Sequence, residues 1–160
     1  MNIPRGSLEL VSCGEYIYAI GGYYIDDDLT YYIILRIVEK YDPRSDKWTE
    51  VSPKHDEHRF SISVVKNEKI FTLSNNTFEV YFPTQNVWKK LPGPDYNVRE
   101  IFLAHFDGKF YAISGNDLLT RTYVTDTKVF QPTTRSWETF QHLPRELEYI
   151  DGLTVFKDAY

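Results

Sequence analysis

The sequence predicts an all-β fold assembled from a repeated four-stranded antiparallel unit. The segment YDPRSDKW at 41–48 recurs as YFPTQNVW at 81–88 and as FQPTTRSW at 130–137, and its last position holds all 3 Trp residues of the chain. Apolar strands recur at a constant distance from this segment: Leu73 lies 25 residues after Trp48, and Ile113 lies 25 residues after Trp88. No window shows sustained helical periodicity. Such a repeat indicates one supersecondary unit stacked several times.

The recurring segment is interpreted as two strands joined by a tight turn. Its aromatic residue and its Trp favour strands, while the Pro two residues after the aromatic fixes φ and removes a donor, so it belongs in the turn. The strand before the turn is expected at 37–41, 77–81 and 127–130. The strand after the turn contains the Trp.

Two further strands precede this hairpin in each unit. Apolar strands are expected at 15–22, 69–75 and 109–115, and the strands before two of them at 60–65 and 101–106. The pairs 67–68 and 107–108 would form two-residue turns, and Asp107-Gly108 is a strong hairpin signal. With a fourth copy of the first strand at 150–156, the prediction is about thirteen strands.

Composition excludes several classes of function. The chain has 18 Lys and Arg against 23 Asp and Glu, a net charge of −5, which argues against a surface for duplex nucleic acid. A lone Cys13 allows no internal disulfide and favours a reducing compartment. No signal-like segment begins the chain, and no run of about 18 apolar residues could span a membrane. A cytoplasmic location is therefore expected.

The ordered motifs resemble the kelch repeat. The resemblance rests on an Arg before the first strand, IYAIGG at 17–22, VEKYDP at 38–43 and the Trp that follows, and it covers essentially the whole chain. It implies that each unit is one blade of a β-propeller. The chain departs from the pattern where Gly21-Gly22 becomes Ser74-Asn75 and Ser114-Gly115, and where Arg5 lies one residue off the spacing of Arg59 and Arg99.

The repeats divide the chain into four segments. We predict repeat 1 at 1–55, repeat 2 at 56–95, repeat 3 at 96–146, and the first strand of a truncated repeat 4 at 147–160. Three blades and one strand fall short of the ~4–8 blades that close a propeller. The sequence therefore predicts a partial propeller belonging to a longer protein, and a dimer that closes six blades is the alternative.

No cofactor, metal site or catalytic residue is expected. Asp26, Asp27 and Asp28 could contact Ca²⁺, but adjacent carboxylates in one loop do not supply the six or more oxygens that this ion takes. His55 and His58 lack a further His or Cys to complete a zinc site. No phosphate-binding loop, nucleophile elbow or Cys–His dyad occurs. The prediction is a protein that is not an enzyme.

Partner binding is expected at the end of the blades that carries the variable connections. The connection between the second and third strands is shortest at 75–76, longer at 116–122 and longest at 23–32, and variation at one point of a repeat marks a binding face. Arg59 and Arg99 have two interpretations: a structural one, in which they bond neighbouring backbone carbonyls or pack on an aromatic ring, and a functional one, in which they bind acidic groups of a partner. The candidate residues are Tyr23, Tyr24, His58, Arg59, Asn75, Tyr96, Arg99, Asn116 and Arg121.

The resemblance implies a protein-interaction module. Kelch propellers of this type often follow BTB and BACK domains in adaptors that deliver substrates to cullin-based ubiquitin ligases, so any cullin contact would pass through a BTB domain that this sequence lacks. Two alternatives stay open. One is an enzyme on the same fold, of a sugar-modifying or oxidase type, and the other is a scaffold that binds actin or the cytoskeleton.

Overall fold

Each aromatic–Pro–Trp segment forms a four-residue turn between two antiparallel strands in the computed structural model, which describes residues 1–25, 31–57, 60–95, 98–113 and 115–143. The fourth turn residue has a positive φ in all three copies, at Asp46 (53°), Asn86 (52°) and Arg135 (54°). Asp and Asn tolerate this left-handed conformation better than most residues do. The turn conformation is therefore repeated in all three copies, whereas the favoured residue types occur in the first two and Arg135 takes their place in the third.

Twelve strands form three four-stranded antiparallel sheets, as the repeat predicts. Sheet 1 contains β1 (Glu9–Cys13), β2 (Tyr16–Ile20), β5 (Val38–Asp42) and β6 (Lys47–Val51). Sheet 2 contains β7 (Ile62–Lys66), β8 (Lys69–Ser74), β9 (Thr77–Phe82) and β10 (Val87–Leu91). Sheet 3 contains β12 (Phe102–Phe106), β13 (Lys109–Ile113), β15 (Asp126–Gln131) and β16 (Ser136–His142).

Four short strands lie outside these sheets. The hairpin of β3 (Tyr23–Ile25) and β4 (Tyr32–Ile34) extends from sheet 1, and β11 (Val98–Arg99) pairs with β14 (Asn116–Asp117) beside sheet 3. They bring the described residues to 16 strands, more than expected, because connections interpreted as loops continue as paired strands. The strand predicted near 150–156 lies outside the described residues, as does most of the segment 147–160 to which it belongs.

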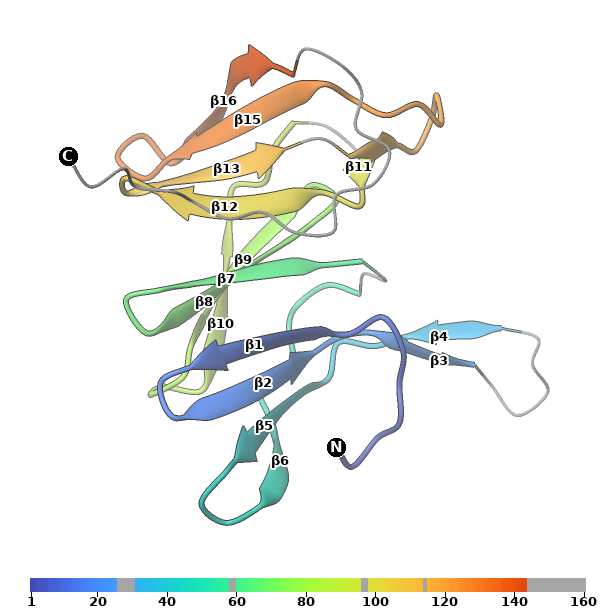
Figure 1. Cartoon of the computed structure of the whole chain (residues 1–160), viewed down its shortest axis with the longest axis vertical. Coiled ribbons are helices and arrows are strands. Elements are labelled where there is room, and N and C mark those ends of the chain that lie inside the picture. Colours follow the sequence, from blue (N-terminus) through green and yellow to red (C-terminus); the bar gives the residue numbers. More distant parts are fainter. Residues whose placement is uncertain (26–30, 58–59, 96–97, 114, 144–160) are drawn as a thin grey trace.

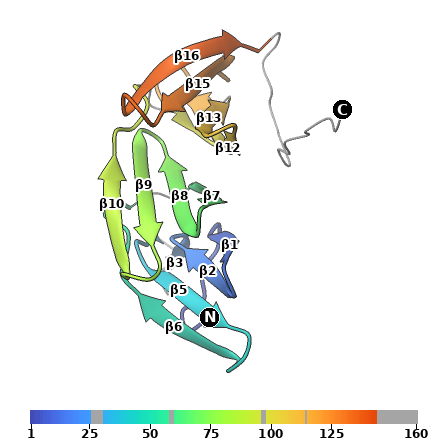
Figure 2. The ribbon, with the colours of Figure 1, turned by 90° about the vertical axis from the view of Figure 1, so that its left-hand side faces the viewer.

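The three sheets follow one another along an arc (Figures 1 and 2). The first strands β1, β7 and β12 lie on its concave side, where β7 contacts both β1 and β12, and the last strands β6, β10 and β16 lie on its convex side. This is the order of strands in successive blades of a propeller. The arrangement gives the strands of each sheet, and the residue boundaries proposed for the four repeats remain predictions.

The hydrophobic core lies between the sheets. One buried cluster joins sheets 1 and 2, with Cys13, Tyr18, Ile20, Val38, Ile70, Tyr81 and Trp88. A second joins sheets 2 and 3, with Leu73, Phe78, Val98, Ile101, Leu103, Phe110, Ala112 and Phe130. Each sheet therefore depends on its neighbour for burial, as stacked repeats do.

The repeated Trp crosses the gap between neighbouring sheets. The Trp88 indole N–H donates to the Ser52 carbonyl at 2.8 Å, and the Trp137 indole N–H donates to the Pro92 carbonyl at 2.7 Å. Ser52 and Pro92 each lie four residues after the Trp of the preceding sheet. The same side chain therefore supplies both a packed ring and a hydrogen bond at each junction.

A partly buried carboxyl lies at the junction of sheets 1 and 2. Glu9 Oε1 accepts a hydrogen bond from the Ser63 backbone N–H at 3.3 Å. Burial raises the pKa of Glu9 to about 7, and the bond from Ser63 opposes this shift only in part. The folded chain therefore binds more protons than the unfolded chain between the ordinary pKa of 4.5 and about 7.

Glu9→Gln should remove this pH dependence. Since the folded pKa is raised, the contribution of Glu9 to stability is fully present below pH 4.5 and is lost as the pH rises through about 7. At pH 8 we expect the free energy of unfolding of the variant to be roughly 1–3 kcal/mol larger than that of the wild type. This difference should shrink toward pH 4. Urea unfolding across this range measures it. Equal pH profiles for Glu9→Gln and the exposed control Glu138→Gln would contradict the assignment.

Candidate protein-interaction site

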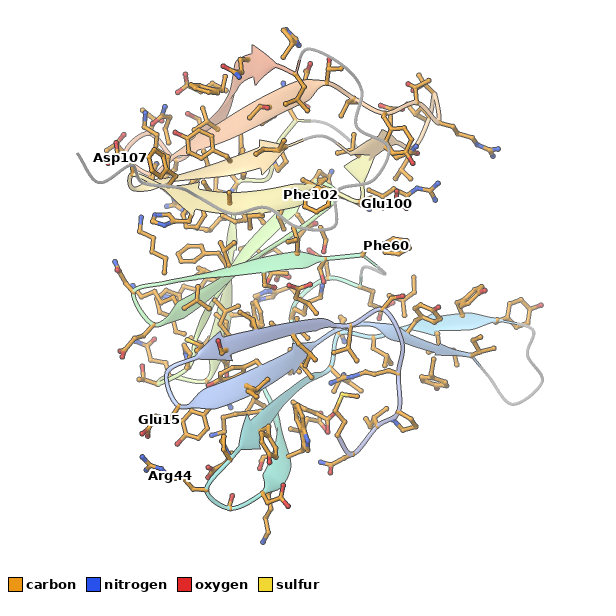
Figure 3. All side chains as sticks on the ribbon, in the orientation of Figure 1. Glu15, Arg44, Phe60, Glu100, Phe102 and Asp107 are labelled. Carbon is orange, nitrogen blue, oxygen red and sulfur yellow. The ribbon has the colours of Figure 1, made fainter. Side chains whose placement is uncertain are left out.

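The strand connections define two ends of the molecule. The turn end carries the tight turns at 14–15, 67–68 and 107–108 and the aromatic–Pro–Trp turns; the loop end carries the β3–β4 hairpin, the turn at 75–76 and the pair β11–β14. Asp107, Glu15 and Arg44 lie at the turn end, whereas Phe60, Glu100 and Phe102 lie at the loop end (Figure 3).

The described candidate residues come from four separate connections at the loop end. Tyr23 and Tyr24 lie on β3, and Asn75 occupies the turn between β8 and β9. Arg99 on β11 pairs with Asn116 on β14. Arg121 follows β14, and its backbone N–H donates to the Asp117 carbonyl at 2.9 Å. The other three candidates, His58, Arg59 and Tyr96, lie outside the described residues.

The β3–β4 hairpin projects from the loop end (Figure 1). Its base is fixed where the backbone N–H groups of Gly6 and Tyr23 each donate to the other's carbonyl, at 2.8 and 3.0 Å. The rings of Tyr23 and Tyr32 pack edge to face at 5.0 Å. Beyond this base, exposed apolar and aromatic side chains occupy both faces of the hairpin, because the neighbouring cross-strand pairs Tyr24–Ile33 and Ile25–Tyr32 point to opposite faces. The aromatic patch of the hairpin is the set of its exposed side chains, namely Tyr24, Ile25, Tyr31, Tyr32 and Ile33.

Sequence reasoning found only part of this hairpin. It selected Tyr23 and Tyr24 but interpreted the connection as a loop, and so missed the pairing of β3 with β4. The available signal was composition, because YYI at 23–25 and YYII at 31–34 consist of aromatic and β-branched residues that favour strands.

The second part of the loop end is polar. The Arg99 side chain is 45% exposed and lies near Glu100, with 3.9 Å between Nε and Oε1. Asn116 is buried, and its Oδ1 has no hydrogen-bond partner among the described residues. The Asp117 carboxylate accepts backbone hydrogen bonds from Leu119 and Thr120, both at 2.8 Å, which lower the pKa of Asp117 and order the connection that presents Arg121.

A cavity of about 310 Å³ opens between the first strands of the three sheets. Its walls come from the segments around Leu8, Ile62 and Ile101, and Asn75, Phe60, Glu100 and Phe102 also line it. The buried Ser74 hydroxyl belongs to this lining and has no partner among the described residues. The loop end thus combines a projecting aromatic patch with a mainly apolar recess.

Arg5 shows that an Arg near the first strand can have a structural role. Its side chain is fully buried and donates to the carbonyls of Ile37 and Ala19 at 3.1 and 3.2 Å and to Glu39 Oε2 at 3.0 Å. The exposed side chain of Arg99 has no comparable set of partners among the described residues. The structural interpretation therefore fits Arg5, whereas the Arg99 side chain is exposed beside Glu100.

Of the two histidines considered as metal ligands, His55 lies within the described residues and His58 does not. His55 contacts the buried Glu79, with 2.7 Å between Nδ1 and Oε1 and 3.0 Å between its backbone N and the same oxygen. Within the described ranges no group of three or more His, Cys, Asp or Glu side chains could hold a metal ion. Asp26, Asp27 and Asp28 lie outside those ranges.

The stacked four-stranded sheets and the repeated Trp junctions define the chain as a set of β-propeller blades. A family model described as the kelch motif matches residues 4–55, which contain sheet 1. The chain belongs to the kelch-repeat family, as the sequence motifs indicated.

Known proteins similar to this chain support the same assignment. Human kelch repeat and BTB domain-containing protein 2 is 33% identical over 113 residues, and its Pongo abelii counterpart is 32% identical over 113 residues; each match covers 71% of this chain. Kelch repeat and BTB domain-containing protein 8 of Danio rerio is 29% identical over 111 residues, or 69% of this chain. The matched part is 18% of the length of each of these relatives.

The fold is also similar to that of a solved structure. The structure of YjhT superposes with a TM-score of 0.75 over 88% of this chain and 53% of that chain, at 13% sequence identity. Identity at this level supports the fold alone. The protein-interaction type of this propeller module is supported by the kelch motif and the kelch relatives. The described residues include no helix with the length and hydrophobicity needed to cross a bilayer.

Proposed function

We propose that this chain is the partner-recognition part of a cytoplasmic kelch adaptor and that its loop end binds a protein. The relatives carry both kelch repeats and a BTB domain in their names, and the kelch resemblance links that combination to cullin-based ubiquitin ligases. In this proposal the blades select a substrate protein, and a BTB domain elsewhere in the adaptor contacts the cullin. The function of the blades is binding and not catalysis.

The observation that carries the proposal is the exposed patch on the β3–β4 hairpin. Tyr31 is 70% exposed and Tyr32 is 54% exposed, and Tyr24, Ile25 and Ile33 are exposed on the same hairpin. Exposed apolar side chains gathered on one projecting element favour an interaction site, and Tyr provides a large contact area with little conformational entropy to lose. Because the hairpin projects beyond the sheets, a partner could contact it and the neighbouring recess together.

Charged and polar residues would surround this aromatic contact. Arg99 and Arg121 are exposed at the loop end, and Asn75 lies at the rim of the recess. We include His58, Arg59 and Tyr96 from their positions in the repeat. Arginine is enriched in binding hot spots, and its guanidinium can pair with carboxylates in two parallel hydrogen bonds. The partner surface should therefore be acidic with apolar groups.

A binding measurement with paired substitutions tests the proposal. Proteins that associate with the full-length adaptor would be identified, and the affinity of each would be measured for the wild type, Tyr24→Ser/Tyr32→Ser and Arg59→Ala/Arg99→Ala. We expect the tyrosine pair to weaken binding by about thirtyfold or more, since an aromatic hot spot contributes at least ~2 kcal/mol. The arginine pair should weaken it by about tenfold.

The matched control is Asp107→Asn in a turn-end hairpin. Asn accepts the positive φ of 46° at this position, so the turn should be kept and binding unchanged. Full affinity after loss of both tyrosines and both arginines, in variants whose circular dichroism is native, would refute the proposed surface. Loss of affinity in Asp107→Asn would place the partner at the turn end and would contradict the proposal.

A further inference from the structure

The turn end holds a second feature, which the loop-end proposal does not use. A crevice of about 300 Å³ lies between sheets 2 and 3, and three of its lining residues are the basic side chains Lys66, Lys69 and Arg135. Lys66 and Lys69 flank the turn between β7 and β8, and Arg135 ends the turn between β15 and β16. Two connections more than sixty residues apart in sequence thus bring their cations to one crevice.

These cations have no carboxylate partner among the described residues. Lys66 Nζ donates to the Gly108 carbonyl at 3.0 Å and lies 5.4 Å from the centre of the Phe110 ring. Lys69 Nζ lies 5.0 Å from the centre of the Phe82 ring. No Asp or Glu lines the crevice, although the chain carries a net charge of −5. The local positive charge therefore has no partner of opposite sign within the crevice.

The interior of the crevice is aromatic. Phe71, Phe110 and Phe130 line it, and the rings of Phe71 and Phe110 are 4.4 Å apart. Phe110 and Phe130 belong to the buried cluster between sheets 2 and 3, so their positions are fixed by packing on the other side. A small apolar side chain entering the crevice would meet a preformed surface and would require little reorganisation.

The junction between sheets 1 and 2 has a corresponding crevice with a different charge. It occupies the same place in the repeat, between a first hairpin turn and the next Pro-containing turn, and measures about 380 Å³. Its lining contains one cation, Lys40, and two carboxylates, Glu15 and Glu68. The excess of cations is therefore specific to the crevice between sheets 2 and 3 and does not follow from the repeat geometry.

We propose that the crevice between sheets 2 and 3 binds an acidic segment of a protein partner, with one apolar side chain of the segment against the partly exposed ring of Phe71 and its carboxylates beside Lys66, Lys69 and Arg135. The aromatic floor selects the apolar side chain, and the three cations select the acidic flanks. This site lies at the turn end, so it could be occupied together with the loop end.

The test is a titration of the 160-residue chain, labelled with ¹⁵N, with the peptide acetyl-Glu-Asp-Phe-Glu-Asp-amide. We expect saturable shifts of backbone amides at 66–69 and 133–135, and weaker binding when salt rises from about 50 to about 300 mM. Lys69→Gln/Arg135→Asn should weaken binding at least about fivefold. Asn is chosen because Asn86 occupies the corresponding turn position with the same positive φ.

Matched controls test whether binding is specific to this crevice. Lys40→Gln, in the corresponding crevice, should leave the affinity unchanged, and so should Tyr24→Ser/Tyr32→Ser at the loop end. A peptide with Gly in place of Phe should bind at least about fivefold more weakly. Absence of saturable shifts, equal affinity of the Gly peptide, equal affinity of Lys69→Gln/Arg135→Asn, or shifts centred on 15–16 and 83–84 would each overturn the proposal.

Discussion

Replacing Trp88 by Ala should destabilise the chain by about 3–5 kcal/mol, the range observed for truncation of buried aromatic residues. Trp88 is 4% exposed, packs on Tyr81 with 4.9 Å between ring centres, and donates its indole N–H to Ser52 in the preceding sheet. Loss of the side chain would leave a cavity between sheets 1 and 2. It would also leave the Ser52 carbonyl without this donor.

Trp48 is the matched control for this substitution. It occupies the same turn position and lies 5.1 Å from Tyr41, but it is only half-buried and has no corresponding indole acceptor among the described residues. We expect Trp48→Ala to cost about 1–2 kcal/mol, because less apolar surface is lost. Urea unfolding followed by circular dichroism compares the two. Equal costs would show that Trp88 does not connect the sheets.

The fold could be predicted because the repeat places chemically distinctive residues at fixed intervals. A Pro and a Trp around each turn identify a hairpin, and Asp46 and Asn86 accept the left-handed backbone that ends it. The turns at 67–68 and 107–108 formed where the sequence indicated, each with two residues of positive φ. Local turn chemistry and apolar spacing agree at these positions, so three-dimensional information was not needed.

The contacts between distant segments could not be predicted in the same way. The partner of Glu39 is Arg5, 34 residues away, and neither the spacing nor the residue types identify the pair. The corresponding position is Glu79 in sheet 2, paired with His55, but Lys128 in sheet 3, whose Nζ donates to Thr139 Oγ1 at 2.8 Å. The repeat conserves the backbone position while the polar partner changes from sheet to sheet.

The candidate site was predictable only as a region. Variable connection length correctly indicated that Tyr23, Asn75 and Asn116 belong to the same end of neighbouring sheets, because equivalent connections of a repeat share one face. It could not indicate that Asn116 is buried, since this depends on the pairing of β14 with β11 from another connection. Nor did it indicate that the two ends of the longest connection pair with each other as β3 and β4. The basic crevice was missed because its residues come from turns of two different repeats.

The second large effect is expected from Arg5→Ala. The Arg5 side chain is fully buried, and its guanidinium contacts Glu39, whose side chain is 1% exposed. Removing one member of a buried ion pair leaves the other charge unpaired in a site of low polarity, which typically costs about 3–5 kcal/mol. The Asn2 backbone N–H, 2.7 Å from Glu39 Oε1, would remain as a partial compensation.

A double substitution separates the ion pair from simple packing. Arg5→Met/Glu39→Gln keeps similar side-chain volumes and removes both charges, so we expect it to be within about 1–2 kcal/mol of the wild type and clearly more stable than Arg5→Ala. Exposed Arg44→Ala, which breaks only a surface pair with Glu15, should cost less than about 1 kcal/mol. If Arg5→Ala cost no more than Arg44→Ala in urea unfolding, Arg5 would not hold the start of the chain against sheet 1. Its role would then not be structural, and the distinction drawn between Arg5 and Arg99 would fail.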